Sequence, residues 1–215
     1  MPKDPDRPRR RYVSPVREAA LVATHGRIVD AAAELFSTEG YRSTTLAAIA
    51  ARAGVSVPRV NLSGSKPALL VEAYQRRAGT TPEQPISESS ELQELMKLPP
   101  EEALPAYAAW LSQVHARSVG LWFSLREAAG TDPEAATAFE AAERSNDEAC
   151  AAAVAWADAQ GLLTGDASAE ERAATWSHVA GAEPYRHFVV ERGWSAERYQ
   201  QWVRRAIERL VLDPA

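Results

Sequence analysis

Apolar residues recur along most of this chain at spacings of three and four, and many of the periodic segments are rich in alanine. Such spacing places the apolar side chains on one face of a helix, which a core can then cover. No segment shows the sustained alternation of β-branched and polar residues that is typical of strands. The pattern therefore predicts an all-α fold.

The first periodic segment has clear helix boundaries. Ser14 can cap a helix and Pro15 suits its first turn, and we expect this helix to end near Ser37, with Gly40 as a left-handed residue beyond it. The fourth helix of the chain is predicted over residues 66–79.

Between these two lie a pair of short helices. The segment 46–53, of sequence LAAIAARA, can be capped by Thr44 or Thr45 and is followed by Gly54, which suits a tight turn. Ser56 can cap the next short helix. Two short helices joined by a turn that contains glycine form a helix-turn-helix, whose second helix enters the major groove of DNA.

Composition divides the chain into four parts. Residues 1–13 are rich in proline and arginine and are expected to form a disordered basic arm. Residues 14–79 form the predicted helix-turn-helix domain. The segment TTPEQPISESS, residues 80–90, is typical of a linker. Residues 91–215 form a second, larger helical domain.

The helices of the larger domain are longer and more acidic. They are predicted at residues 101–116, 119–129, from 131 to 161, from 168 to 192 and from 195 onward. Thr131 with Glu134, and Ser168 with Glu171, have the spacing of a capping box. Pro184 is expected to kink the helix that contains it.

Charge is distributed unevenly along the chain. The net charge is −5, but residues 1–78 hold 13 Lys and Arg against 7 Asp and Glu, whereas the remainder has an excess of 11 acidic residues. Neutralising the phosphates of a nucleic acid requires Lys and Arg on one surface, so the front of the chain is the part expected to meet DNA. A basic disordered tail is the alternative explanation, because Arg7, Arg9, Arg10 and Arg11 lie in the predicted arm.

Several protein classes are not expected. The chain has no apolar run of about 20 residues, the length that spans a bilayer, and no apolar leader follows its basic N-terminus. We expect a cytoplasmic protein without a membrane partner. The one cysteine, Cys150, lies in an alanine-rich run and is interpreted as a small buried thiol, so no disulfide is predicted.

Catalytic motifs are absent from the sequence. The four histidines are scattered, and HExxH, CxxC and GxSxG spacings do not occur. Glu183 and His187 have helical spacing, but Pro184 between them argues against a metal site. We therefore expect neither an enzyme nor a cofactor.

The stretch GRIVDAAAELFSTEGYRSTTLAAIAARAGVS, residues 26–56, resembles the N-terminal domain of the TetR family of bacterial transcriptional regulators. The similarity resumes at Ser65-Lys66 and at Ala68-Leu69-Leu70. The rest of the chain matches only in architecture. The resemblance implies an N-terminal helix-turn-helix domain and a larger helical domain that binds a ligand and dimerises.

The expected DNA contacts are divided between backbone and bases. Helix starts at the threonine pair and at Lys66 can hold phosphates, and an arginine on the third helix can pair with guanine. Capping alone is the alternative role of Thr45 and Ser56, and a solvated charge that of Lys66. The predicted DNA contacts are Thr44, Thr45, Ser56, Val57, Pro58, Arg59, Asn61 and Lys66.

The third helix departs from the family pattern. Relatives usually carry Thr at Arg59, Tyr at Asn61 and an aromatic pair ending in Phe where this chain has only Ser63, and the stretch is one residue short. Loss of a buried Phe typically costs about 3 to 5 kcal/mol, so this domain must repack or its third helix must be shorter or more mobile. Three interpretations remain open: altered operator specificity, weakened binding rescued by the basic arm in a minor groove, or lost operator binding.

The resemblance also implies a homodimer in which the last two helices of each subunit form a four-helix bundle. The apolar seam of the last helix is wide and carries two large aromatic residues, which supports this interpretation, although packing within one chain is the alternative. The predicted interface residues are Trp176, Phe188, Tyr199, Trp202, Val203, Ile207 and Leu210.

A pocket for an unknown small molecule is expected between the linker and the dimer seam. Its candidate walls are Tyr107, Trp110, Trp122, Phe123, Phe139 and Trp156, with His178, His115, Gln113 and Asn146 as orienting polar groups. Plain core packing is the alternative for each aromatic residue. The acidic excess favours a cationic or neutral ligand over an anionic one.

These observations predict a ligand-responsive transcriptional regulator, a repressor, that binds palindromic double-stranded operator DNA as a homodimer. Ligand binding in the larger domain is expected to move the fourth helix and change the separation of the two recognition helices. The alternative is a TetR-fold module that binds a ligand or a protein and has lost specific operator binding.

Overall fold

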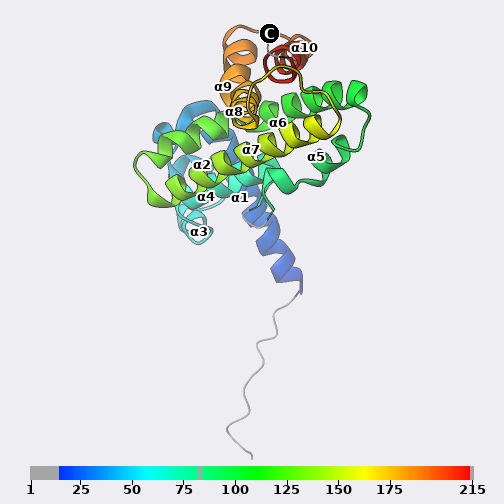
Figure 1. Cartoon of the computed structure of the whole chain (residues 1–215). Helices are drawn as coiled ribbons and strands as arrows, with labels where there is room; N and C mark the ends of the chain where they lie inside the picture. The colour runs from blue at the N-terminus through cyan, green and yellow to red at the C-terminus, as the bar shows by residue number, and fades with distance from the viewer. Residues whose placement is uncertain (1–14, 82–83, 214–215) are drawn as a thin grey trace, which may run out of the picture.

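The computed structural model describes residues 15–81 and 84–213, and the regular elements in those residues are helices, apart from one isolated bridge between Thr81 and Gln84 (Figure 1). The all-α prediction is confirmed. The basic arm predicted at residues 1–13 lies outside the described residues. No described helix is long and apolar enough to cross a membrane.

Four helices form the front of the molecule: α1 (Pro15–Ser43), α2 (Leu46–Ala53), α3 (Val57–Asn61) and α4 (Lys66–Ala78). Gly40 interrupts α1 with a φ of +81°, as the sequence indicated, and a short helical segment follows it up to Ser43. Thr45 caps α2 by accepting a hydrogen bond from Ala48 N at 3.1 Å, and Gly54 ends it in the left-handed conformation.

The remaining elements are η1 (Ile86–Glu88), α5 (Ser90–Leu95), α6 (Pro100–Ala129), α7 (Pro133–Ala159), α8 (Ala169–Ala180), α9 (Ala182–Tyr185), η2 (Arg186–Glu191), α10 (Ala196–Ile207) and η3 (Glu208–Leu212). Of these, η1 is a short 3-10 helix, and η2 and η3 are π-helical turns that continue α9 and α10. The helices α8 to α10 gather at the end of the molecule that holds the C-terminus, and the start of α1 projects at the opposite end (Figure 1).

Three boundaries differ from the sequence prediction. The segments 101–116 and 119–129 form one helix, α6. Asp132, not Thr131, caps α7, because its carboxylate accepts hydrogen bonds from Glu134 N and Ala135 N, whereas the Thr131 hydroxyl donates to Ala128 O. The helix predicted over residues 168–192 is broken at Gly181, three residues before Pro184. The capping box of Ser168 and Glu171 is confirmed.

The front core crosses the predicted linker. It consists of the buried faces of α1 to α4 together with Leu121, Leu125 and Ala128 of α6 and Ala135 of α7. Because helices from both sides of residues 80–90 share this core, the front four helices pack firmly against α6. The domain division at 80–90 stays a prediction.

Backbone contacts reinforce the junction between α1 and α6. Gly120 lies so close to α1 that a Cβ there would come within 2.7 Å of Ser37 O. The Ser124 hydroxyl donates to Phe36 O at 2.6 Å, and Tyr41 N donates to a Glu127 carboxylate oxygen at 3.0 Å. The contact therefore requires a glycine at position 120, and hydrogen bonds of Ser124 and Glu127 on the same helix accompany it.

The rear core is built by α6, α7, α8, α9, α10 and η3, and its largest fully buried side chains are Trp176 and Tyr199. Arg172 is buried beside it, and its guanidinium donates to the backbone carbonyls of Ala167, Leu212, Val211 and Thr164. These bonds tie the end of the described chain to α8. Cys150 is buried in this core, as predicted.

Candidate DNA-binding and ligand-binding sites

The third helix is formed but short. Helix α3 spans five residues, Val57–Asn61, and only Val60 is buried beneath it. The Ser63 hydroxyl donates to Arg59 O at 3.2 Å, and Gly64 N donates to Val60 O, so the chain turns immediately after the helix. Of the outcomes expected from the missing aromatic pair, the structure has the shorter helix.

An aromatic pair on α1 packs against the first residue of α4. The rings of Phe36 and Tyr41 stack at 5.9 Å, and the Lys66 ammonium lies 4.2 Å from the centre of the Tyr41 ring. This burial lowers the pKa of Lys66 by desolvating its charged form, while the Glu127 carboxylate acts in the opposite direction. Lys66 is therefore half-buried against a ring and not a freely solvated charge.

The hydroxyl groups at the helix starts differ in what they can reach. Thr44 is fully buried and its hydroxyl donates to Gly40 O at 2.8 Å, so the prediction that it presents a hydroxyl to phosphate is corrected. Thr45 is exposed while it caps α2. Ser56 occupies the N-cap position of α3, but its side chain makes no capping hydrogen bond. Capping alone does not account for Ser56.

The exposed surface of α3 carries most of the predicted base-reading residues. Val57, Pro58 and Asn61 are exposed and Arg59 is half-buried. Leu62, directly after the helix, is 80% exposed and was missed by sequence reasoning. Val60 already supplies the buried apolar residue of this short helix. The sequence signal for Leu62 is therefore an apolar residue that the core does not need.

Behind the helix-turn-helix lies a cavity of about 710 Å³. It is enclosed by α4, α6, α7 and the predicted linker, and its walls include Val71, Tyr74, Gln75, Tyr107, Trp110 and Trp122. Three of the aromatic residues predicted for a pocket thus line one space. The linker residues Thr80, Thr81, Pro85 and Ile86 also line it, and Ile86 N donates to the Ser145 hydroxyl at 3.0 Å.

The other predicted pocket residues lie elsewhere. Phe123 is sandwiched between the guanidinium groups of Arg126 and Arg186, at 4.5 and 4.3 Å from its ring centre. Phe139 packs at 4.9 Å on Trp122, on the side of the front core. Their assignment to the cavity wall is corrected, because each ring is occupied by another contact.

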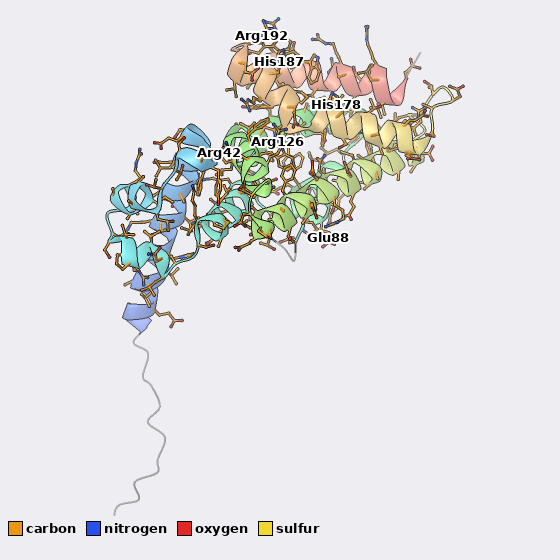
Figure 2. All side chains as sticks on the ribbon, turned by 90° about the vertical axis from the view of Figure 1, so that its left-hand side faces the viewer. Arg42, Glu88, Arg126, His178, His187 and Arg192 are labelled. Atoms are coloured by element: carbon orange, nitrogen blue, oxygen red, sulfur yellow. The ribbon has the colours of Figure 1, made fainter. Side chains whose placement is uncertain are left out.

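Trp156 and His178 are also corrected. The Trp156 indole donates to Met96 O at 2.9 Å and joins α7 to the segment after α5. His178 is exposed on α8 (Figure 2), and Gln113 is exposed on α6. Asn146 does line the cavity, and its amide donates to the Ser177 hydroxyl at 3.0 Å.

The most constrained polar group of the cavity is His115. It is buried, and the hydrogen bond between Nε2 and Ala180 O, 2.9 Å long, requires the proton to be on Nε2. Burial lowers the pKa of His115 to about 4, against the opposing effects of the Ala180 bond and the Glu183 charge. The ring is therefore neutral at neutral pH, and Nδ1 is left as an acceptor.

Two indole groups in the cavity wall are also unpaired. The N–H groups of Trp110 and Trp122 are buried and find no acceptor among residues 15–81 and 84–213. Tyr74, on α4, packs 5.9 Å from Trp122, and burial raises its pKa well above the usual range. An aromatic contact thus joins the cavity wall to the fourth helix.

The predicted dimer seam is mostly inside the subunit. Trp176, Tyr199, Val203 and Ile207 are at most 2% exposed, so their assignment to an intersubunit surface is corrected. An amphipathic helix buries the same face whether the partner is its own chain or a second copy. The remaining predicted interface residues are accessible: Phe188 and Trp202 are half-buried, and Leu210 is 54% exposed. Val190 on η2, 61% exposed, was not predicted.

Together these features define an all-helical protein with an N-terminal helix-turn-helix domain. Residues 28–73 match the family model of bacterial regulatory proteins of the tetR family. The chain carries the N-terminal domain of TetR-family transcriptional regulators, and the resemblance identified from the sequence is confirmed. No curated protein matches the chain.

Solved structures share the fold over nearly the whole chain. A transcriptional regulator from Saccharomonospora viridis in complex with choline aligns with a TM-score of 0.68 and 18% identity, covering 89% of this chain and 99% of that one. A regulator from Pseudomonas aeruginosa PAO1 aligns with a TM-score of 0.63 and 19% identity over 94% of each chain. A TetR-family regulator from Mesorhizobium loti MAFF303099 gives 0.64 and 22%, over 87% and 95%. At these identities the likeness shows the fold.

Proposed function

We propose that this protein is a ligand-responsive repressor that binds palindromic operator DNA as a homodimer. One observation carries the proposal: α4 belongs to both candidate sites. Its first residue, Lys66, lies beside the helix-turn-helix, and further along Val71, Tyr74, Gln75 and Ala78 line the cavity. A change in the cavity therefore acts directly on the helix that supports the DNA-binding surface.

The proposed DNA surface follows from accessibility and chemistry. Thr45, Ser56 and Lys66 hold phosphates from the starts of α2, α3 and α4. Val57, Pro58, Arg59 and Asn61 face the major groove, where arginine pairs with guanine. The short α3 reads fewer bases than a longer helix, so Arg59 carries a large share of the sequence preference.

Coupling is proposed to run through α4. Toward α1, the Glu72 carboxylate is hydrogen-bonded to His25 Nε2, which lies 2.8 Å from each carboxylate oxygen. Toward α6, Tyr74 contacts Trp122. A ligand that enlarges the space between Tyr74 and α6 favours one position of α4, and DNA favours another. The difference in ligand affinity between the two positions sets how strongly the ligand releases DNA.

The homodimer is proposed to form through η2, α10 and η3. Two half-sites on DNA call for a two-fold symmetric protein. Val190 and Leu210 expose apolar side chains there, and Phe188 stacks on Trp194 at 4.3 Å and contacts Trp202 at 4.7 Å. We expect Val190→Glu with Leu210→Glu to lower the dimer fraction in sedimentation velocity, while Gln201→Glu on α10 leaves it unchanged. A dimer that survives the double substitution contradicts this face.

The structural neighbour in complex with choline supports a small-molecule effector for a protein of this fold. In this proposal the protein acts by binding alone and has no catalytic role. In this proposal the protein represses transcription while it is bound to its operator, and effector binding ends repression by releasing the protein from DNA.

The first test is selection from random duplex DNA at two salt concentrations, with the wild type and two variants. Arg59→Ala removes the proposed base contact, and Arg117→Ala, exposed on α6 and outside the proposed DNA and dimer surfaces, is the matched control. We expect a palindromic site that Arg59→Ala relaxes at one position and Arg117→Ala does not.

A second candidate function is favoured by the five-residue length of α3. A TetR-fold module that has lost operator recognition would show only weak, unselective binding that falls steeply with salt. Such a result would contradict the repressor proposal and direct attention to partners of the larger domain.

A further inference from the structure

We infer that the cavity takes a neutral, largely apolar molecule with an aromatic ring and a hydroxyl group that donates a hydrogen bond to His115 Nδ1. This inference rests on the proposed function, because it names the ligand class of the proposed effector site. The charge, the shape and the free hydrogen-bonding groups of the cavity support it.

Formal charges are confined to the mouth of the cavity. The charged residues that line it, Glu134, Arg144 and Glu148, are all exposed and lie on α7. Within the described parts of the chain, Arg172 is the only buried Arg, Lys, Asp or Glu, and it is bonded to backbone carbonyls outside this cavity. A charged group deep in the cavity would lose its hydration without a counter-charge, which is strongly unfavourable. The body of the ligand is therefore neutral.

The walls favour an aromatic molecule of drug-like size. A volume of about 710 Å³ lies in the range of pockets that enclose such ligands. The Tyr107 and Trp110 rings form a pair at 5.8 Å, and Tyr74 and Trp122 form a second pair at 5.9 Å. Leu111 and Val114 of α6 add apolar surface to the cavity wall. Ring stacking and apolar contact supply most of the affinity.

Hydrogen bonding gives the ligand its orientation. His115 Nε2–H is occupied by Ala180 O, and this is the hydrogen bond that the ring makes among the described residues. Ser118, three residues further along α6, also lines the cavity and donates its hydroxyl proton to Val114 O, so its oxygen can still accept. Two acceptors on one helix face call for a donor on the ligand, and a neutral hydroxyl supplies it.

The inference is tested with one hydrocarbon body that carries four different groups. The probes are 4-phenylphenol, biphenyl, biphenyl-4-carboxylate and (biphenyl-4-yl)trimethylammonium, titrated into the purified full chain without DNA at pH 7.5 by calorimetry. We expect 4-phenylphenol to bind about two- to tenfold more tightly than biphenyl, as one hydrogen bond allows. Both charged analogues should bind at least about tenfold more weakly than the phenol.

Variants of His115 assign the preference to its ring. His115→Phe keeps an aromatic side chain but removes the acceptor, so the phenol and biphenyl should bind equally. His115→Gln, which offers both an N–H for Ala180 and a carbonyl oxygen, should restore part of the difference. Ser118→Ala should reduce it less than His115→Phe. Thermal unfolding of each variant shows whether it is folded before it is titrated.

Three results would overturn the inference: binding of none of the four probes, tighter binding of the carboxylate or the ammonium compound, or an unchanged phenol preference in His115→Phe. Tighter ammonium binding would indicate an aromatic cage for a cation. Because these titrations contain no DNA, their failure leaves operator selection untouched. Failure of operator selection likewise leaves a measured phenol preference intact.

Discussion

The front core and the rear of the molecule pack differently around the same helix, α6. At the front, Gly120 of α6 approaches the backbone of Ser37 so closely that a methyl group would not fit. Toward the rear, Trp110, His115 and Ser118 of the same helix face a cavity of about 710 Å³. The difference separates two tasks: the closely packed front holds the helix-turn-helix in place, and the cavity behind it leaves room for the effector that we propose.

The largest expected effect tests which apolar residues of α10 and η3 lie in the core and which lie on the surface. Ile207 is fully buried in the rear core, and Leu210 is 54% exposed. Ile207→Ala should lower the free energy of unfolding by about 4 kcal/mol, because it removes buried methyl groups and leaves a void. Leu210→Ala should change it by less than about 0.5 kcal/mol. Urea unfolding followed by circular dichroism measures both, and equal losses would contradict the assignment of Leu210 to the surface.

Gly120→Ala should show that the front contact is closed. Alanine normally stabilises a helix by about 1 kcal/mol relative to glycine, but here the methyl group collides with the Ser37 backbone. We expect a net loss of about 2 to 3 kcal/mol in the free energy of unfolding. Gly130→Ala is the control, because a Cβ at Gly130 meets its nearest atom at an ordinary 3.6 Å. A stabilised Gly120→Ala protein would show that α1 and α6 can separate at little cost.

Acid should destabilise the rear through His115. Its pKa is lowered from 6.5 to about 4 by burial, so the unfolded chain binds a proton in the interval between these values that the folded chain does not. Stability is therefore lost as the pH falls through that interval, by about 2 kcal/mol between pH 7.5 and pH 5. His115→Gln should lose that much less over the same range in chemical unfolding. Parallel pH curves for the two proteins would mean that the ring is not desolvated.

The smallest expected effect on stability comes from adding a side chain to the cavity, where there is space for it, in contrast to Gly120→Ala. Ala142 on α7 is half-buried at the cavity wall, and Ala142→Leu should extend into empty space. The free energy of unfolding should change by less than about 1 kcal/mol, since no packed atoms are displaced. Binding of 4-phenylphenol should weaken at least about tenfold by loss of volume. Ala152→Leu, on an exposed part of the same helix, should affect neither quantity.

The front of the molecule was predictable because its boundaries are local. Thr45, Gly54 and Gly40 act within one turn of their own helices, through a capping hydroxyl and left-handed glycine conformations that neighbours in sequence decide. Thr44 was assigned to the wrong environment because two adjacent threonines offer the same cap, and only the packing of α1 against α2 decides which one is buried.

The cavity was only partly predictable. Trp110 and Trp122 were expected to share a space with Phe123, which follows Trp122 directly and so points about a quarter turn away. The sequence analysis also predicted two helices where the structure has one, α6. The directions of side chains before and after residue 117 could therefore not be related to each other. Phe123 therefore faces Arg126 and Arg186 instead of the cavity.

The sequence by itself determined the helical class, the helix-turn-helix, the family resemblance and the basic front, because capping residues, apolar period and charge act over short distances along the chain. Only the tertiary structure decided which aromatic residues enclose the cavity, that the linker forms one of its walls, and that Tyr199, Val203 and Ile207 lie inside the subunit. An apolar face must be covered, but its period does not specify the covering surface. That choice depends on contacts between segments far apart in sequence, which are settled when the whole chain packs.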